Sequence, residues 1–353
     1  MQHAAGTGAA PYRIAAHDPD RLPLVVDANG RRDRERLVAW LRDRAEWVQG
    51  TLTRNGALLL RGFDVTDAPA FEAVARAVDP GVRADFLGTP SARLTDNVFR
   101  ASDVPGGYPI APHCEMSYLR TPPRRVFFCC LSEPRTGTGE TPLADFRRVW
   151  RALDPALRAR FERGGIVIVR TFRGPASRRK RRFRLERWDD FFATRDRTVV
   201  EEKCAAEGIA FEWTGDDGLR LRITQPVTRA HPETGETVWY NQYAAHHLAS
   251  SAWTYPKIFR LRPTLHHLVW WQLVRASVAV KRRAPADELA YFCTYADGSA
   301  IPDADVKALL ETIWRHTVLA PWRRGDVLAI DNRAVAHGRM PFRGPRHVVA
   351  CLA

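Results

Sequence analysis

The chain has 353 residues, of which 45% are hydrophobic and 27% charged, an ordinary composition for a globular protein. No apolar run approaches the roughly 20 residues that a membrane-spanning helix needs. The first residues show no basic stretch followed by an apolar one, so we expect no signal peptide and a cytoplasmic location.

The charge balance is strongly basic, with 54 Lys and Arg against 40 Asp and Glu and a formal net charge of +14. This balance favours acidic partners such as nucleic acid, a phosphorylated metabolite or an acidic protein. The arginine enrichment of a high-GC genome explains it equally well. The six cysteines form no C-x-x-C pair, which disfavours a zinc ribbon or a thioredoxin-like site and predicts reduced thiols.

The N-terminal part predicts a helix, a strand and a second helix. Apolar spacing indicates a helix over residues 34–53, and a short buried strand is expected over residues 57–60. Thr66 is expected to cap a helix that ends at Val78.

A Gly-, Pro-, Ser- and Asp-rich stretch over residues 80–112 predicts a long functional loop. Beyond it, the sequence predicts strands over residues 125–131, 218–224, 237–240, 327–330, 334–337 and 347–352, a buried helix over 263–280 and another helix over 303–316. Short strands towards both ends with helices between them favour one mostly β domain over residues 1–353, a jelly roll with helical insertions.

Residues 172–188 form the most basic segment, with eight Arg or Lys residues. Such a run repels itself, so we expect an exposed surface insertion. It is either a solvated loop or, over residues 173–187, a docking patch for an acidic carrier protein.

The sequence His113-Cys114-Glu115 follows the long loop. In a strand, residues i and i+2 point to the same face, so His113 and Glu115 can hold one metal ion while Cys114 packs away from it. His337 is predicted to end a strand near the C-terminus. If a hairpin centres on Pro341 and Phe342, Arg346 lies opposite His337 on the next strand.

Two histidines and one carboxylate that leave open positions on the metal are typical of non-haem Fe(II) oxygenases, which use O₂. Arg346 offers a fork that pairs with a carboxylate through two hydrogen bonds. A co-substrate that chelates iron at one end and meets this arginine at the other indicates 2-oxoglutarate.

The sequence resembles the taurine dioxygenase-like (TauD/TfdA) family of Fe(II)/2-oxoglutarate oxygenases, near clavaminate synthase, asparagine oxygenase and the syringomycin-type aspartyl hydroxylase. The resemblance runs from about Gly56 to the C-terminus. It is carried by residues 56–63, 113–118, 139–145, 231–235, 238–242, 322–326 and 331–346.

The resemblance implies a double-stranded β-helix fold. It also implies iron ligation by His113, Glu115 and His337, and binding of 2-oxoglutarate by Arg346 with help from Thr141. The alternative for Thr141 is an ordinary turn residue.

Two departures from the family pattern bear on the chemistry. Glu115 stands where Asp is common, and a carboxylate there disfavours halogenation. Ala350 stands where several relatives carry a second arginine for the substrate, so the resemblance does not identify the substrate.

Asn241 and Gln242 also match a family motif and are candidates for the substrate pocket, with hydrogen bonding of a buried turn as the alternative. Neighbouring residues do not share a face, so His246-His247 and His266-His267 are expected to be structural, and Trp270-Trp271 is expected in the core.

The predicted activity is hydroxylation of an unactivated C–H bond in an amino acid or amino-acid-derived metabolite of secondary metabolism. The substrate is either free or tethered to a carrier protein. The alternatives are desaturation or another oxidation of a small metabolite, nucleic-acid demethylation and a non-catalytic binding protein. No nucleic-acid module is recognisable, which disfavours demethylation.

Overall fold

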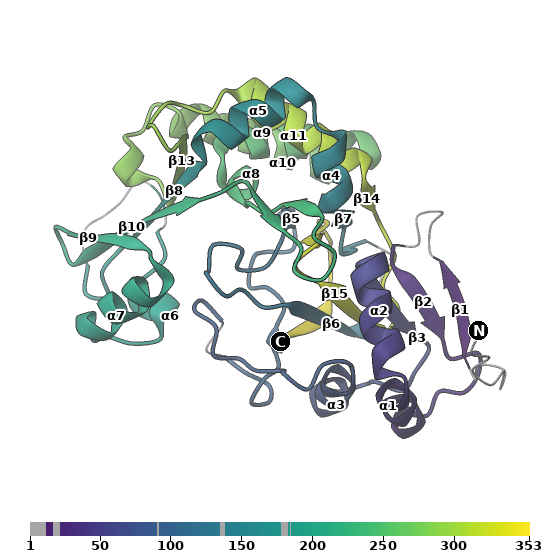
Figure 1. Ribbon diagram of the computed structural model, residues 1–353. Helices are drawn as coiled ribbons and strands as arrows, with labels where there is room; N and C mark the ends of the chain where they lie inside the picture. The colour runs from purple at the N-terminus through teal and green to yellow at the C-terminus, as the bar shows by residue number, and fades with distance from the viewer. Residues whose placement is uncertain (1–11, 17–21, 90–91, 135–137, 178–182, 184) are drawn as a thin grey trace.

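The computed structural model describes residues 12–16, 22–89, 92–134, 138–177, 183 and 185–353 (Figure 1). The helices are α1 (Arg34–Asp43), α2 (Ala45–Asn55), α3 (Ala68–Val78), α4 (Phe146–Ala152), α5 (Pro155–Gly164), α6 (Trp188–Phe192), α7 (Arg197–Glu207), α8 (Tyr243–His246), α9 (Leu248–Leu261), α10 (Leu265–Lys281) and α11 (Asp303–Arg315). A 3₁₀ turn spans Ala286–Glu288.

The largest sheet has seven strands in the order β1-β2-β3-β15-β6-β17-β4. Their bounds are β1 (Arg13–Ala16), β2 (Leu24–Asp27), β3 (Ala57–Arg61), β15 (Val327–Asp331), β6 (Arg125–Ser132), β17 (His347–Leu352) and β4 (Phe99–Arg100). Only β2 and β3 pair in parallel, and the other neighbours are antiparallel.

A second sheet has the order β14-β7-β16-β5, with bounds β14 (Thr317–Val318), β7 (Leu143–Asp145), β16 (Val335–Arg339) and β5 (Ile110–His113). A third has the order β13-β8-β10-β9, with bounds β13 (Tyr291–Tyr295), β8 (Ile166–Phe172), β10 (Gly218–Gln225) and β9 (Ala210–Thr214). The strands β11 (Thr228–Ala230) and β12 (Thr237–Trp239) form a separate pair.

The side chains of the seven-stranded sheet alternate between two cores. In β3, Leu58 and Leu60 pack in a cluster with α1, α2 and α3, while Leu59 faces a cluster shared with the second sheet. In β6, Phe127 packs in the cluster with α1, α2 and α3, and Phe128 packs in the cluster shared with the second sheet. Both faces are therefore buried, which explains why these strands read as continuous apolar runs.

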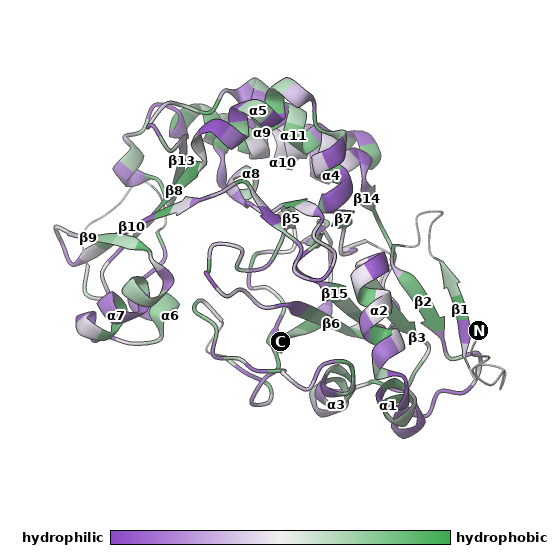
Figure 2. Cartoon of the chain, viewed as in Figure 1, coloured by the Kyte–Doolittle hydropathy of each residue, from purple (hydrophilic) through white to green (hydrophobic). Residues whose placement is uncertain are grey.

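The outer face of the second sheet is covered by another group of helices. Ala144 of β7 and Ala336 of β16 belong to a cluster with residues of α4, α5, α8, α9 and α11. Figure 1 shows the helices α4, α5, α9, α10 and α11 gathered above β5 and β7. Figure 2 shows both hydrophilic and hydrophobic residues along α1 and α2, as expected of helices with one buried face. The prediction of a β core with helical insertions is confirmed.

Several local predictions need correction. The helix predicted over residues 34–53 is two helices, because the chain breaks at Arg44, which has φ −116° and ψ 29°. The cap of α3 is Asp67 rather than Thr66, and the Asp67 carboxylate accepts a hydrogen bond from the Ala70 N–H. The loop over residues 80–112 contains β4 and most of β5.

The helix predicted over residues 263–280 exists as α10, but it is not buried. Val278 is its one buried residue, and Trp270 and Trp271 are only partly covered. The predicted hairpin between residues 337 and 346 is wrong, because β16 and β17 belong to different sheets. None of the described helices combines the length and the apolar composition needed to cross a bilayer.

Candidate metal centre

Three side chains from distant parts of the chain meet between the two main sheets. His113 is the last residue of β5 and pairs directly with His337 of β16. His337 lies within its strand rather than at its end. Glu115 follows β5 in a turn, so the expectation that both residues of His113-Cys114-Glu115 lie in a strand is wrong, although both still reach the same point.

The geometry of the three groups suits a single metal ion. Glu115 Oε2 lies 3.3 Å from His337 Nε2 and 3.8 Å from His113 Nε2. One ligand atom from each residue lies within 4.8 Å of the other two. Because a metal ion bonds each such ligand at about 2.0–2.2 Å, the three atoms are close enough to share one ion.

Hydrogen bonding orients the first imidazole for this role. His113 Nδ1 lies 2.9 Å from the Ala111 carbonyl oxygen, to which it donates, and this directs Nε2 towards Glu115. His337 Nδ1 is buried and has no hydrogen-bond partner among the described residues. The Phe128 ring packs 5.0 Å from the His337 ring and limits its movement.

Asn332 fixes the main chain of Glu115. Its Oδ1 accepts a hydrogen bond from the Glu115 N–H at 2.6 Å, and its Nδ2 donates to the Glu115 carbonyl at 2.9 Å. Nδ2 also donates to the Pro123 carbonyl at 2.7 Å. In the sequence Asn332 is only part of the 331–346 stretch that carries the family resemblance, and its full burial beside Glu115 is seen only in the structure.

The electrostatics of the three groups follow from their closeness. Burial would raise the pKa of Glu115, but hydrogen bonds from His113 and His337 outweigh it and hold the pKa well below its usual range. Burial would lower the pKa of His113, but the Glu115 carboxylate raises it overall. Burial lowers the pKa of His337. Glu115 is therefore an anion at neutral pH, as a metal ligand must be.

A cavity of about 130 Å³ adjoins the three groups. It is lined by Ala101, Ser102, Ile110, His113, Glu115, Phe128, Thr141, His337, Gly338, Arg339 and Arg346. Arg346, in the loop just before β17, and His337 of β16 thus line the same cavity without sharing a hairpin.

Arg346 presents its guanidinium in this cavity. Its Nε donates to the Gly139 carbonyl at 2.9 Å. Burial, with a smaller contribution from the charge of Arg339, lowers the pKa of Arg346 to about 10. Among the residues that the structure describes, no carboxylate pairs with it, so its charge is available to an anionic ligand. Thr141 lines the same cavity, and its Oγ1 accepts a hydrogen bond from Trp322 Nε1 at 3.2 Å.

Arg339 is a second arginine of the cavity that the sequence reading missed. Its terminal nitrogens donate to Val104, Pro105 and Tyr108 carbonyls at 2.7–2.8 Å, which ties the loop of residues 101–109 to β16. Its Nε is buried and unpartnered in the described part of the chain. Arg339 therefore shapes the wall of the cavity.

Asn241 and Gln242 do not line this cavity. Asn241 Nδ2 donates to the Pro226 carbonyl, and its Oδ1 accepts from the Tyr243 N–H. Gln242 Nε2 donates to Ser117 Oγ at 3.1 Å. These contacts favour the alternative role, hydrogen bonding of a buried turn.

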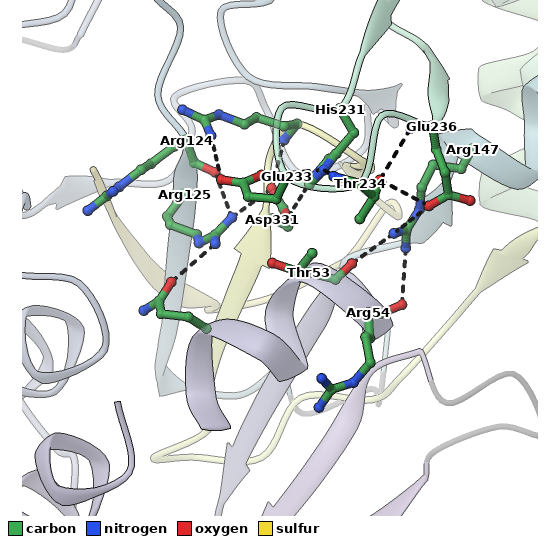
Figure 3. A network of polar contacts seen from close by, with 12 residues as sticks. Thr53, Arg54, Arg124, Arg125, Arg147, His231, Glu233, Thr234, Glu236 and Asp331 are labelled. Carbon is green, nitrogen blue, oxygen red and sulfur yellow. Dashed lines mark hydrogen bonds and ion pairs between the residues drawn. The ribbon is translucent and has the colours of Figure 1, made fainter. Parts of the chain in front are cut away.

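A polar network lies behind the Asn332 turn (Figure 3). Asp331 pairs with Arg125 Nη1 at 2.7 Å and with His231 Nε2 at 3.0 Å, and all three side chains are buried. Figure 3 shows His231 entering from the 231–236 turn, which also brings Glu236 to Arg147. Arg147 in turn donates to the Thr53 carbonyl at the end of α2. The network joins the seven-stranded sheet, the 231–236 turn, α4 and α2.

Two histidines and one carboxylate beside a cavity with an unpaired arginine define a class of non-haem iron oxygenase. The sequence profile described as "Taurine catabolism dioxygenase TauD, TfdA family" matches residues 22–352. The chain therefore belongs to the TauD/TfdA family and is a non-haem Fe(II)/2-oxoglutarate-dependent dioxygenase. Its cofactors are Fe(II), 2-oxoglutarate as co-substrate, and O₂.

Two curated relatives are similar along most of the chain. The dapdiamide synthesis protein DdaC of Enterobacter agglomerans is 29% identical over 306 residues, which cover 86% of this chain and 84% of that protein. A clavaminate synthase-like protein of Arabidopsis thaliana is 29% identical over 321 residues, covering 88% and 86% of the two chains.

Solved structures share the fold at low sequence identity. PvcB of Pseudomonas aeruginosa, 14% identical, superposes with a TM-score of 0.51 over 100% of this chain and 94% of that one. AAD-2, solved with Mn(II) and N-oxalylglycine, is 14% identical with a TM-score of 0.51 over 97% and 96% of the two chains.

Proposed function

We propose that His113, Glu115 and His337 hold the catalytic iron and that Arg346, with Thr141, binds the distal carboxylate of 2-oxoglutarate. The observation that carries this proposal is the convergence of the three ligand atoms within 4.8 Å of one another, beside a cavity that also contains Arg346 and Thr141. The residues fit the group, because the Ala111 carbonyl orients the His113 imidazole and Asn332 fixes the main chain of Glu115.

Bound iron supplies the oxidative decarboxylation of 2-oxoglutarate to succinate and CO₂, coupled to oxidation of the substrate. The protein contributes position and shielding. Asn332 holds Glu115, Arg346 offers its charge to the co-substrate, and Arg339 keeps the loop of residues 101–109 against the cavity. Phe128 and Ile110 give the cavity apolar walls that limit water.

We propose further that the substrate is an amino acid or an amino-acid-derived metabolite of secondary metabolism, and that the product is hydroxylated. The names of the relatives support this: DdaC is a dapdiamide synthesis protein, and PvcB is described as an oxygenase from an isonitrile synthetic pathway. Desaturation or another oxidation of such a metabolite is the alternative outcome.

The test is an assay of succinate formed from 2-oxoglutarate under Fe(II) and O₂ with a panel of free amino acids. We expect succinate release to rise with a particular amino acid and an added oxygen atom in its product. His113→Ala and His337→Ala should abolish both, whereas His266→Ala, a histidine of α10 that does not line the cavity, should leave them unchanged. Full activity in the first two variants would overturn the metal assignment.

As the alternative to a free amino acid, we propose a substrate tethered to an acidic carrier protein, which docks at the basic insertion over residues 173–187. Most of its cations lie outside the described residues, namely Arg178, Arg179, Lys180, Arg181, Arg182 and Arg184. Its two described ends lie together, since the Arg173 N–H donates to the Glu186 carbonyl. Turnover of the same amino acid, free and carrier-loaded, tests the proposal, and equal turnover contradicts it.

We make three broader proposals about this chain. The two sheets that face each other across the cavity are the halves of a double-stranded β-helix, and residues 1–353 act as one domain.

The six cysteines are free thiols, which is the usual state in a reducing compartment, and we propose a cytoplasmic location on that ground.

A further inference from the structure

The helix α10 exposes an apolar face that the rest of the described chain leaves uncovered. Leu265 is 77% exposed, Leu273 55% and Val269 48%, and Val280 and Ala276 are also exposed. Large apolar side chains gathered on one helix are costly in water, so an exposed group of this kind marks an interaction surface.

The spacing of this face indicates what covers it. Val269, Leu273, Ala276 and Val280 follow one another at intervals of four, three and four residues. This is the narrow seam by which one helix packs against another. A membrane-surface helix shows instead a broad apolar face with exposed aromatic residues. Here Trp270 and Trp271 turn to Tyr108 and Phe259 within the protein.

The charged residues of the segment that contains the seam indicate the charge of its partner. Residues 237–286, which include α9 and α10, contain no Asp or Glu and seven Lys or Arg residues. Two of these, Arg262 and Arg282, pair with Glu140 and Asp303 from other segments. Arg260, Arg275 and Arg283 are exposed, and no ion pair forms at them within the described residues.

We infer that the α10 seam is a docking surface for a protein that presents an acidic amphipathic helix. A second copy of this chain does not fit, because it would bring the same carboxylate-free segment and a net charge of +14 to the contact. The inference concerns this surface alone and stands whether the substrate is free or tethered.

The surface lies close to the metal cavity. Trp270 of the same helix packs against Tyr108, with ring centroids 4.5 Å apart. Tyr108 belongs to the loop that Arg339 ties to β16, and Ala101 and Ser102 of that loop line the cavity. A partner docked on α10 therefore contacts the helix whose Trp270 packs against the loop beside the metal cavity.

The test uses a labelled three-heptad peptide with Leu at the seam positions and Glu at the flanking positions, titrated into the full-length protein by fluorescence anisotropy. We expect saturable binding that weakens with salt. Leu273→Ser and Arg275→Glu should each raise the dissociation constant about tenfold or more. Leu94→Ser and Arg222→Glu, which change an exposed leucine and an exposed arginine elsewhere, should bind like the wild type.

Other outcomes overturn the inference. If a peptide with Lys in place of Glu binds equally well, the partner is not acidic. If Leu94→Ser weakens peptide binding as much as Leu273→Ser does, the peptide does not bind at the α10 seam. A wild-type dimer in sedimentation that Leu273→Ser dissociates would assign the face to a second copy. Binding to anionic phosphatidylglycerol vesicles without binding to the peptide would assign it to a lipid surface.

Discussion

Asn332 holds the main chain of Glu115 through two hydrogen bonds. Asn332 Oδ1 accepts from the Glu115 N–H, and Asn332 Nδ2 donates to the Glu115 carbonyl. The two residues are 217 positions apart in the sequence. The turn between β15 and β16 therefore sets where the carboxylate stands, while the next strand carries His337.

Asn332→Ala should markedly raise the dissociation constant for the metal, with only a small loss in the free energy of unfolding. Loss of a group that orients a metal ligand typically costs about 10–100-fold in metal affinity. The measurement is a Co(II) titration followed by absorbance, with folding checked by circular dichroism.

The matched control for this prediction is Asn241→Ala. Asn241 is equally buried and also bonds the main chain, but it lies away from Glu115. We expect a loss of stability with unchanged Co(II) affinity. Equal losses of affinity in both variants would show that Asn332 acts only through general stability.

Arg346→Gln should raise the KM for 2-oxoglutarate and leave metal affinity unchanged, because Arg346 lines the cavity but is not one of the three groups that meet at the metal site. Loss of a charge-assisted pair with a carboxylate corresponds to about 1.5–3 kcal/mol, or roughly 10- to 100-fold in KM. Steady-state succinate assays at varied 2-oxoglutarate measure it. Arg346→Lys should recover only part of the loss, since a single ammonium does not form the bidentate contact. An unchanged KM in Arg346→Gln would contradict the assignment.

Removal of one partner of the buried ion pair between Arg125 and Asp331 should strongly destabilise the fold. Arg125→Met leaves the Asp331 carboxylate buried without its guanidinium partner, beside His231 and the Arg333 N–H, which we expect to cost about 3–5 kcal/mol of unfolding free energy. Urea unfolding measures this value. The double variant Arg125→Met/Asp331→Asn should be more stable than Arg125→Met alone, and a further loss would contradict the account.

The cysteines should be inert in the folded protein. Burial raises the pKa of Cys293 and Cys130 to about 12 and that of Cys204 to about 11. At pH 8 these thiols are protonated and enclosed, so we expect almost no reaction with a disulfide reagent until the protein unfolds. Because the folded pKa values exceed the unfolded ones, stability should fall as the pH rises from about 9 towards 12. Rapid labelling of the native protein at pH 8 would contradict this burial.

The sequence was sufficient for features that depend on local pattern or short motifs. The apolar runs of β3, β6 and β15 are strands, and His113, Glu115 and His337 come together. These predictions worked because alternation, length and residue type determine a strand, and a metal site restricts which residue types it uses.

The features that failed depend on contacts between distant segments. His337 and Arg346 were expected on one hairpin, yet β16 pairs with β5 and β7, and β17 pairs with β6 and β4. The apolar composition of α10 was read as burial, although composition does not say whether another element of the same chain covers a helix. Asn332 and Arg339 were missed because their partners are main-chain atoms, which have no signature in the sequence.

The most direct test is an anaerobic crystal structure with Mn(II) and N-oxalylglycine in place of iron and 2-oxoglutarate. The account predicts one metal ion bonded to His113 Nε2, Glu115 and His337 Nε2, at about 2.0–2.2 Å from each, with the distal carboxylate of the analogue on Arg346. A metal bound elsewhere, or an analogue carboxylate held away from Arg346, would contradict it.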